Sequence, residues 1–201
     1  MGILRICLLV VIVLVGAGLG SFLAFQQIDH KPLNDTRNGA IIDDYWVTDL
    51  DIGATDASGL LRARIARRGL FALNRAEAIY FTRSVDDFGN PLRADCQYDI
   101  AGGPLPAEWW SITLYGQDNY LARNTDKAAS LNGFDPRLNG PTWQAVIASS
   151  PVAETPWMST NGVSQFDVTL RLYGPDLDMV TAPEYTGFPQ ITPRNCPEAP
   201  N

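Results

Sequence analysis

The chain of 201 residues is 46% hydrophobic and carries a formal net charge of −7 at pH 7. Fourteen of the 15 basic side chains and all 22 acidic ones follow the apolar segment at residues 6–25, so the part of the chain after this segment has a net charge of −8. An acidic surface with few lysines excludes nucleic acid as the expected partner and disfavours general adhesion to anionic lipid, because both interactions need basic side chains.

The first predicted element is a membrane-spanning helix. Residues 6–25, ICLLVVIVLVGAGLGSFLAF, contain no charged side chain. At about 1.5 Å per residue they span roughly the 30 Å hydrocarbon core of a bilayer. We expect residues 1–26 to form an uncleaved signal anchor. The alternative is a signal peptide cleaved near Gly18 and Gly20, but the apolar run continues beyond that site.

The charges at the two ends of this segment predict its orientation. Arg5 precedes the segment and Asp29 follows it, so the positive-inside rule places the N-terminus in the cytoplasm. We therefore expect a single-pass protein of the bacterial inner membrane, with its C-terminal domain in the periplasm. Residues 27–40 are predicted to be a juxtamembrane linker. Residues 41–201 are predicted to form a single β-rich domain with its own core.

One short helix is predicted at the start of the domain. Asp56 is positioned to cap residues 57–69, ASGLLRARIARRG, and Gly69 is placed to end the helix. The helix carries the basic cluster Arg62, Arg64, Arg67 and Arg68. This cluster could face membrane headgroups or an acidic partner. The simpler interpretation is a solvated helix face whose last charges suit the negative end of the helix dipole.

The residues after this helix alternate with period two, which predicts strands. Residues 77–85 and 94–102 are expected to form a hairpin around the turn DDFGNP. Further strands are predicted in WWSITLYGQDNY from residue 109, in TWQAVIAS at residues 142–149 and in FDVTLRLYGPD from residue 166. The pattern predicts a mainly β domain, an antiparallel β-sandwich or jelly roll with one short helix.

Two of these strands end in the same Leu-Tyr-Gly motif, and we expect both to be central strands over one core. Each has an apolar and a polar-aromatic face, since side chains alternate along a strand. The polar-aromatic faces hold the candidate ligand-binding residues Trp109, Tyr115, Arg171 and Tyr173. A central-strand arginine needs a carboxylate, an anionic ligand or water. Asp167 or another buried acid is the structural alternative to a ligand carboxylate or phosphate. For the whole face, the alternative is packing against a second layer.

Two cysteines, Cys96 and Cys196, lie beyond the apolar segment. A pair of cysteines in an oxidising compartment usually forms a disulfide. This bridge would close a loop of about 100 residues, which the chain-entropy model values at about 4.7 kcal/mol. Two unrelated free thiols are the alternative. A disulfide would agree with export from the cytoplasm.

Several separated segments recur in the order of a known family. They are ARIARRGLFALNRAEAIYF, GGPLPAEWWSITLYGQDNYLARN, PWMST and FDVTLRLYGP. In these segments the chain resembles the bacterial domain-of-unknown-function family 1214, across nearly all of residues 41–196. The resemblance implies a mostly β fold and no established chemistry. In that family the domain often follows a partner, family 1254, and this sequence is interpreted as a membrane-anchored form without it.

Some members of the family are described as carboxylesterases, which the residues here disfavour. A Ser-His-Asp hydrolase needs an imidazole beside its serine, and the single histidine, His30, falls in the predicted linker. The G-x-S-x-G motif is also missing from the sequence. The lone histidine disfavours a metal site as well, and no cofactor is expected. No catalytic residue is assigned.

The sequence favours a binding or scaffolding module of the cell envelope. Its partner would be a glycan, a small anionic ligand or an envelope protein. The alternative is an envelope hydrolase that acts on a glycan or similar polymer through paired carboxylates. Glu77, Glu108, Glu154, Glu184 and the many aspartates supply candidates for such a pair, and the sequence does not single one out.

Overall fold

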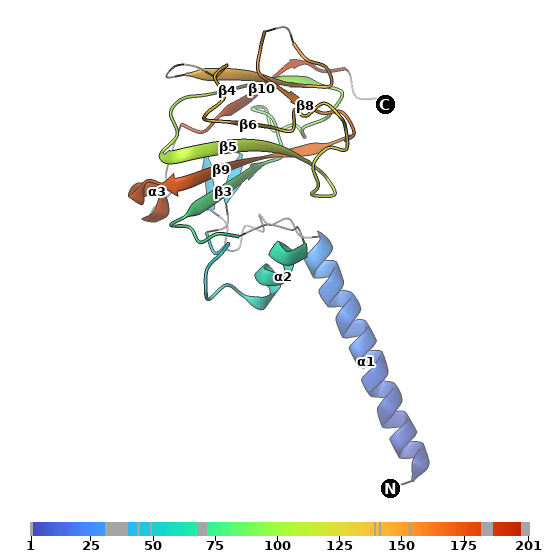
Figure 1. Cartoon of the computed structure of the whole chain (residues 1–201). Helices are drawn as coiled ribbons and strands as arrows, with labels where there is room; N and C mark the ends of the chain where they lie inside the picture. The colour runs from blue at the N-terminus through green and yellow to red at the C-terminus, as the bar shows by residue number, and fades with distance from the viewer. Residues whose placement is uncertain are drawn as a thin grey trace.

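The computed structural model shows a long N-terminal helix attached to a β-sandwich (Figure 1). It describes residues 2–30, 40–43, 45–48, 50–67, 72–138, 140, 142–152, 154–181 and 187–197. Most of the predicted linker, together with Arg68, Gly69 and Glu184, therefore lies outside the described residues.

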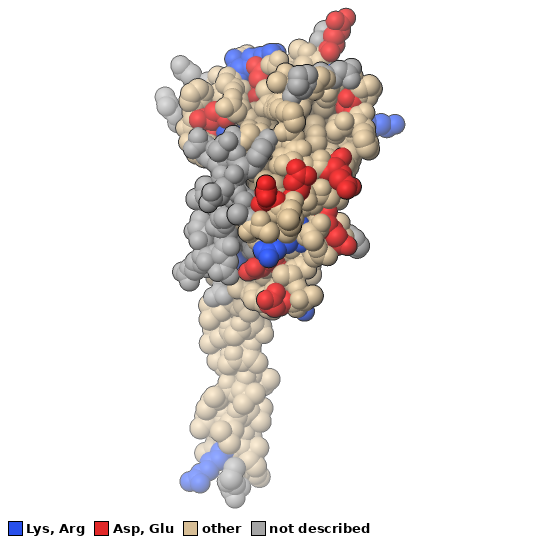
Figure 2. Space-filling view, turned by 90° about the vertical axis from the view of Figure 1, so that its left-hand side faces the viewer, with Lys and Arg blue, Asp and Glu red and all other residues tan. Residues whose placement is uncertain are grey.

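The N-terminal helix α1 runs from Ile3 to His30. Its segment Ile3–Gln26 is long and apolar enough to cross a membrane, as a single-pass anchor or a signal peptide would. All described side chains of α1 are exposed, and exposed apolar surface of this extent needs a cover such as lipid. Figure 2 shows basic side chains at the free end of the helix and acidic side chains spread over this face of the domain. The helix ends at His30, inside the predicted linker.

The larger sheet has six antiparallel strands in the order β1-β2-β3-β9-β5-β6. Their bounds are β1 Ala40–Asp43, β2 Trp46–Thr48, β3 Ala78–Arg83, β9 Phe166–Pro175, β5 Ala107–Gly116 and β6 Ser130–Asn132. Strands β5 and β9 pair along their length, with Ile112 opposite Leu170. They are the two Leu-Tyr-Gly strands, and their central position is confirmed.

The smaller sheet has four strands in the order β10-β4-β7-β8. Their bounds are β10 Gln190–Asn195, β4 Gln97–Gly102, β7 Trp143–Ala148 and β8 Trp157–Ser159. The pairs β10–β4 and β4–β7 are antiparallel, and β7–β8 is parallel. The predicted antiparallel pattern therefore has one exception, at the edge of this sheet.

The hydrophobic core lies between the two sheets. Phe81, Ile112 and Leu170 point into it from the larger sheet, and Ile100 and Ile147 point into it from the smaller one. All five side chains are completely buried. Period-two alternation explains this arrangement, because it gives each strand one apolar face for the core. The mainly β sandwich is confirmed.

The predicted hairpin of residues 77–85 and 94–102 is wrong. The turn between them forms, because the Asp86 carboxylate accepts hydrogen bonds from the backbone N–H groups of Phe88 and Asn90, both at 2.9 Å. However, β3 belongs to the larger sheet and β4 to the smaller one. The connecting segment carries Leu92 and Cys96 into the core, with 1% and 2% of their surface exposed. Burial of these side chains favours the crossover between sheets.

The predicted short helix is α2, Gly59–Arg67, but its cap is Ser58 and not Asp56. The Ser58 hydroxyl accepts a hydrogen bond from the Leu61 N–H at 3.2 Å, and the Ser58 carbonyl accepts the first helical one, from Arg62. Serine at this position satisfies a free N–H of the first turn. A second short helix, α3 (Leu177–Thr181), follows β9 and is not predicted by the sequence.

Cys96 and Cys196 form the predicted disulfide, with their Cα atoms 4.3 Å apart. Cys96 directly precedes β4, and Cys196 directly follows β10. The bridge therefore ties the end of the C-terminal edge strand to its neighbour in the smaller sheet.

Candidate functional site

The four candidate ligand-binding residues lie on one surface, the outer face of the larger sheet. Trp109 and Tyr115 extend from β5, and Arg171 and Tyr173 extend from β9. The antiparallel register places Trp109 opposite Tyr173 and Arg171 opposite Ser111. All four side chains are half-buried. We call this surface the polar-aromatic face.

Arg171 is the only formal charge among these four residues, and neutral groups hold it. Its Nη1 donates to the Thr113 hydroxyl at 3.0 Å, and its Nη2 donates to the Tyr115 hydroxyl at 2.6 Å. The guanidinium carbon lies 5.4 Å from the centre of the Tyr115 ring. Within the described part of the chain, Arg171 forms no ion pair, with Asp167 or with any other carboxylate. The structural alternative in which Asp167 neutralises Arg171 is therefore not realised.

Aromatic rings form one end of the polar-aromatic face. The Trp109 ring centre lies 5.0 Å from that of Tyr173 and 6.2 Å from that of Phe134. Phe134 is 80% exposed. The Trp109 indole N–H is buried and has no hydrogen-bond partner among the described residues. These half-buried and exposed rings offer a flat surface on which a ligand ring can stack.

Tyr80, which is not among the residues predicted from the sequence, extends the polar-aromatic face onto a third strand. It lies on β3 directly opposite Arg171. Burial raises the pKa of the Tyr80 phenol; the hydrogen bond from the Leu73 N–H opposes this shift, and the neighbouring Tyr173 adds to it. Alternation in AIYFTR places Tyr80 on the polar face of its strand. The pairing of β3 with β9, however, is not visible in the local sequence.

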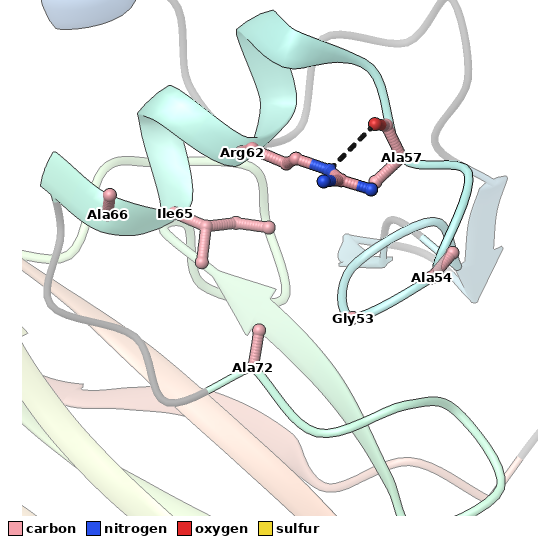
Figure 3. A pocket seen from close by; sticks show the side chains of 7 residues that line it. All are labelled: Gly53, Ala54, Ala57, Arg62, Ile65, Ala66 and Ala72. Atoms are coloured by element: carbon pink, nitrogen blue, oxygen red, sulfur yellow. Dashed lines mark hydrogen bonds between the residues drawn. The ribbon is translucent and has the colours of Figure 1, made fainter.

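Three pockets in the described residues lie away from the polar-aromatic face. None of them is lined by one of the four candidate ligand-binding residues. Their volumes are 330, 560 and 720 Å³. The smallest lies between α2, the loop at residues 53–57 and Ala72 (Figure 3). Its lining is mostly alkyl, with the Arg62 guanidinium beside it donating through Nε to the Ala57 carbonyl at 3.0 Å. We call it the α2 pocket.

The carboxylates in the described residues do not single out a catalytic pair. None of the three pockets is lined by two acidic residues. The carboxyl pKa is lowered at Asp87, Asp95, Asp126 and Asp135. A general acid needs the opposite shift, because it must hold a proton near neutral pH. These four aspartates are therefore charged hydrogen-bond acceptors, and Asp87, Asp95 and Asp135 also form ion pairs with arginines.

Metal-ligating side chains do not converge in the described residues. No group of three or more His, Cys, Asp or Glu side chains is placed there to hold a metal ion. His30 is the last residue of α1 and precedes all the strands in the sequence. The absence of a cofactor stays a prediction.

These features define a class of protein: a disulfide-bonded β-sandwich that follows an apolar N-terminal helix and displays a polar-aromatic sheet face. The family model described as "Protein of unknown function (DUF1214)" matches residues 77–177. The chain belongs to this family, and the resemblance seen in the sequence is confirmed. The matched region includes all four candidate residues.

One solved structure supports the fold, and a second gives a weaker match. The VPA0106 protein from Vibrio parahaemolyticus is similar with a TM-score of 0.55 and 22% identity, over 70% of this chain and 36% of that one. An uncharacterised protein from Burkholderia cenocepacia gives a TM-score of 0.40 and 16% identity, over 62% of this chain and 31% of that one. The present chain thus spans about a third of each of these proteins. No curated protein matches the sequence.

Proposed function

We propose that the protein is a membrane-anchored binding module of the bacterial envelope, and that its polar-aromatic face binds an acidic glycan in the periplasm. The observation that carries this proposal is Arg171, a half-buried central-strand cation whose partners are the neutral hydroxyls of Thr113 and Tyr115. Partial burial weakens the hydration of a charge, so an anionic partner gains more here than at an open surface.

The geometry of Arg171 leaves donors for such a partner. A guanidinium has five N–H donors, and two of them reach Thr113 and Tyr115. The remaining donors belong to a planar fork that suits a carboxylate or a phosphate. The two hydroxyls fix the plane of this fork before a ligand arrives, which reduces the entropy lost on binding.

The neighbouring rings favour a saccharide over a simple anion. Tyr173 lies two residues from Arg171 on the same face, which is about 6.8 Å along a strand. A sugar ring stacked on Tyr173 and Trp109 would bring a uronic-acid carboxylate close to the Arg171 guanidinium. The exposed ring of Phe134 extends the stacking surface beyond Trp109.

The location in this proposal rests on α1 and on the disulfide. An uncleaved α1 would hold the domain at the membrane, and the Cys96–Cys196 bridge suits an oxidising compartment such as the periplasm. The net charge of −8 after the apolar segment keeps most of the domain away from an anionic membrane surface.

A thermal-shift comparison tests the proposal. The full chain in neutral detergent is melted with glucuronic-acid oligosaccharides and with uncharged glucose oligosaccharides of equal length. We expect the acidic sugar at 100 times its Kd to raise the Tm by about 5–10 °C. Arg171→Gln should abolish the rise, while Arg123→Gln, which removes an exposed charge outside the face, should keep it. Equal shifts with both sugars, or in both variants, would contradict the proposal.

A further inference from the structure

Helix α2 lies beside the outer end of the membrane-spanning segment. The guanidinium carbon of Arg67 is 5.3 Å from the centre of the Phe25 ring. Phe25 is the last residue but one of the apolar segment Ile3–Gln26. Figure 1 shows α2 next to this end of α1, below the β-sandwich. An α1 that spans the bilayer would therefore place α2 at the level of the lipid headgroups.

The exposed side of α2 consists of apolar and basic residues. Leu60, Arg62, Ala66 and Arg67 are exposed, and at 100° per residue they fall within an arc of about 160°. Leu61, on the other side, is buried. The helix contains no acidic residue, although the chain as a whole is acidic. An exposed helix side that is basic and carries no acidic residue is attracted to an anionic lipid surface.

Arg62 is oriented for an anion by the loop before the helix. Its Nε donates to the Ala57 carbonyl at 3.0 Å, and its Nη2 donates to the Thr55 carbonyl. It forms no ion pair with a carboxylate in the part of the chain that the structure describes. The α2 pocket of 330 Å³ lies beside it, and Ile65 and Ala72 point toward one another across this pocket (Figure 3). A phosphate with an alkyl group attached fits such a combination.

We infer that α2 binds the headgroups of anionic phospholipids in the leaflet where α1 ends, through Arg62 and Arg67 and the small residues between them. This inference rests on the retention of α1 that the proposed function assumes, and it is independent of the glycan. Charge complementarity is local: α2 is attracted to an anionic surface, while the acidic remainder of the domain is repelled from it. The two effects together would point the sandwich away from the membrane and leave the polar-aromatic face accessible.

Mixed micelles test this inference with the full chain. The Tm is measured in dodecyl maltoside with added phosphatidylglycerol, and again with added phosphatidylcholine. We expect the anionic lipid to raise the Tm by about 2–4 °C relative to the zwitterionic lipid. Flotation with phosphatidylcholine vesicles is measured alongside, because it reports on α1 alone.

Two matched pairs of variants locate the effect. Ala66→Glu adds an acid to the exposed side of α2 and should abolish the phosphatidylglycerol shift, whereas Ala66→Gln, of nearly equal size, should keep it. Arg62→Ala should reduce the shift by at least half, and Arg123→Ala should leave it intact. An unchanged Tm in phosphatidylcholine shows that each variant folds. The Arg62→Ala and Arg123→Ala pair decides the question if Ala66→Glu does not fold.

The outcomes separate the inference from the proposed anchor. A chain that floats with phosphatidylcholine vesicles but shows no phosphatidylglycerol shift overturns the role of α2 and leaves the anchor standing. A chain that does not float overturns both. A shift that persists fully in Ala66→Glu and Arg62→Ala assigns the lipid effect to another surface and overturns the inference.

Discussion

Arg171 and Tyr115 are joined across neighbouring central strands, with the guanidinium Nη2 donating to the tyrosine hydroxyl at 2.6 Å. This bond orients a cation that has no carboxylate partner among the described residues. Tyr115→Phe keeps the ring and removes the hydroxyl, so we expect the free energy of unfolding to fall by about 1 kcal/mol. Urea denaturation of the full chain in detergent measures this change. Tyr120→Phe, at a 62% exposed tyrosine, should have no effect; equal losses in the two variants would contradict the assignment.

The Cys96–Cys196 disulfide should contribute strongly to stability. Its sequence separation of 100 residues means that its removal frees a long loop in the unfolded chain. We expect reduction with dithiothreitol, or Cys196→Ser, to lower the free energy of unfolding by about 3–5 kcal/mol. Cys7→Ser is the control, because Cys7 is an exposed free cysteine of α1. A urea midpoint that does not move on reduction would show that the bridge is dispensable.

Asp87 links Arg83 to the C-terminal strand, so its charge should matter more than that of a surface aspartate. Arg83, only 4% exposed, lies 2.6 Å from Asp87, which also accepts hydrogen bonds from the Ile191 N–H at 3.0 Å and the Thr192 hydroxyl at 2.6 Å. Asp87→Asn leaves a buried guanidinium without its counter-ion and should destabilise the fold by about 2–3 kcal/mol.

Asp118 provides the matched control for this change. Its ion pair with Arg123 is solvent-exposed and 3.8 Å long. Asp118→Asn should therefore change the free energy of unfolding by less than about 0.5 kcal/mol. If the two variants unfold at the same urea concentration, the Arg83–Asp87 contact is not the stabilising link that its burial indicates.

Asp126 should make the stability depend on acidic pH. Hydrogen bonds from the Ser159 hydroxyl and the Asn161 side chain lower the pKa of its carboxyl in the folded chain. The unfolded chain therefore binds this proton more readily than the folded chain does. The stability that the charged Asp126 carboxylate contributes is complete above the ordinary aspartate pKa of about 3.9. It is lost as the pH falls through the lower pKa of the folded chain. Urea midpoints between pH 6 and pH 2 should fall less steeply for Asp126→Asn than for the natural chain. Parallel curves would mean that Asp126 titrates as it does when unfolded.

The strands that bear the candidate site could be predicted because they are long and alternate strictly. In β9, Val168, Leu170 and Leu172 face the core while Arg171 and Tyr173 face outward, as period two requires. The strands β6 and β8 have only three residues each, which is too short to show a period. For this reason no strand is predicted at these two edge positions of the sheets.

Local turn chemistry explains the main error about the fold. Asp86 builds a tight turn after β3, and a tight turn between two alternating segments normally indicates a hairpin. Which sheet the next strand joins depends on contacts far away in the sequence, such as the pairing of Ile100 with Ile191. The position of Tyr80 beside Arg171 could not be predicted for the same reason: it depends on the pairing of β3 with β9, which are distant in the sequence.

Isothermal titration of the full chain with a glucuronic-acid oligosaccharide tests the central claim, that Arg171 and the rings beside it form an anion-binding site. We expect saturable binding that Arg171→Gln weakens at least tenfold. Arg171→Lys should be intermediate, because lysine keeps the charge and loses the planar fork. Higher salt should weaken binding to the natural chain more than to Arg171→Gln. Absence of binding, or equal affinities in the natural chain and Arg171→Gln, would show that Arg171 does not form such a site.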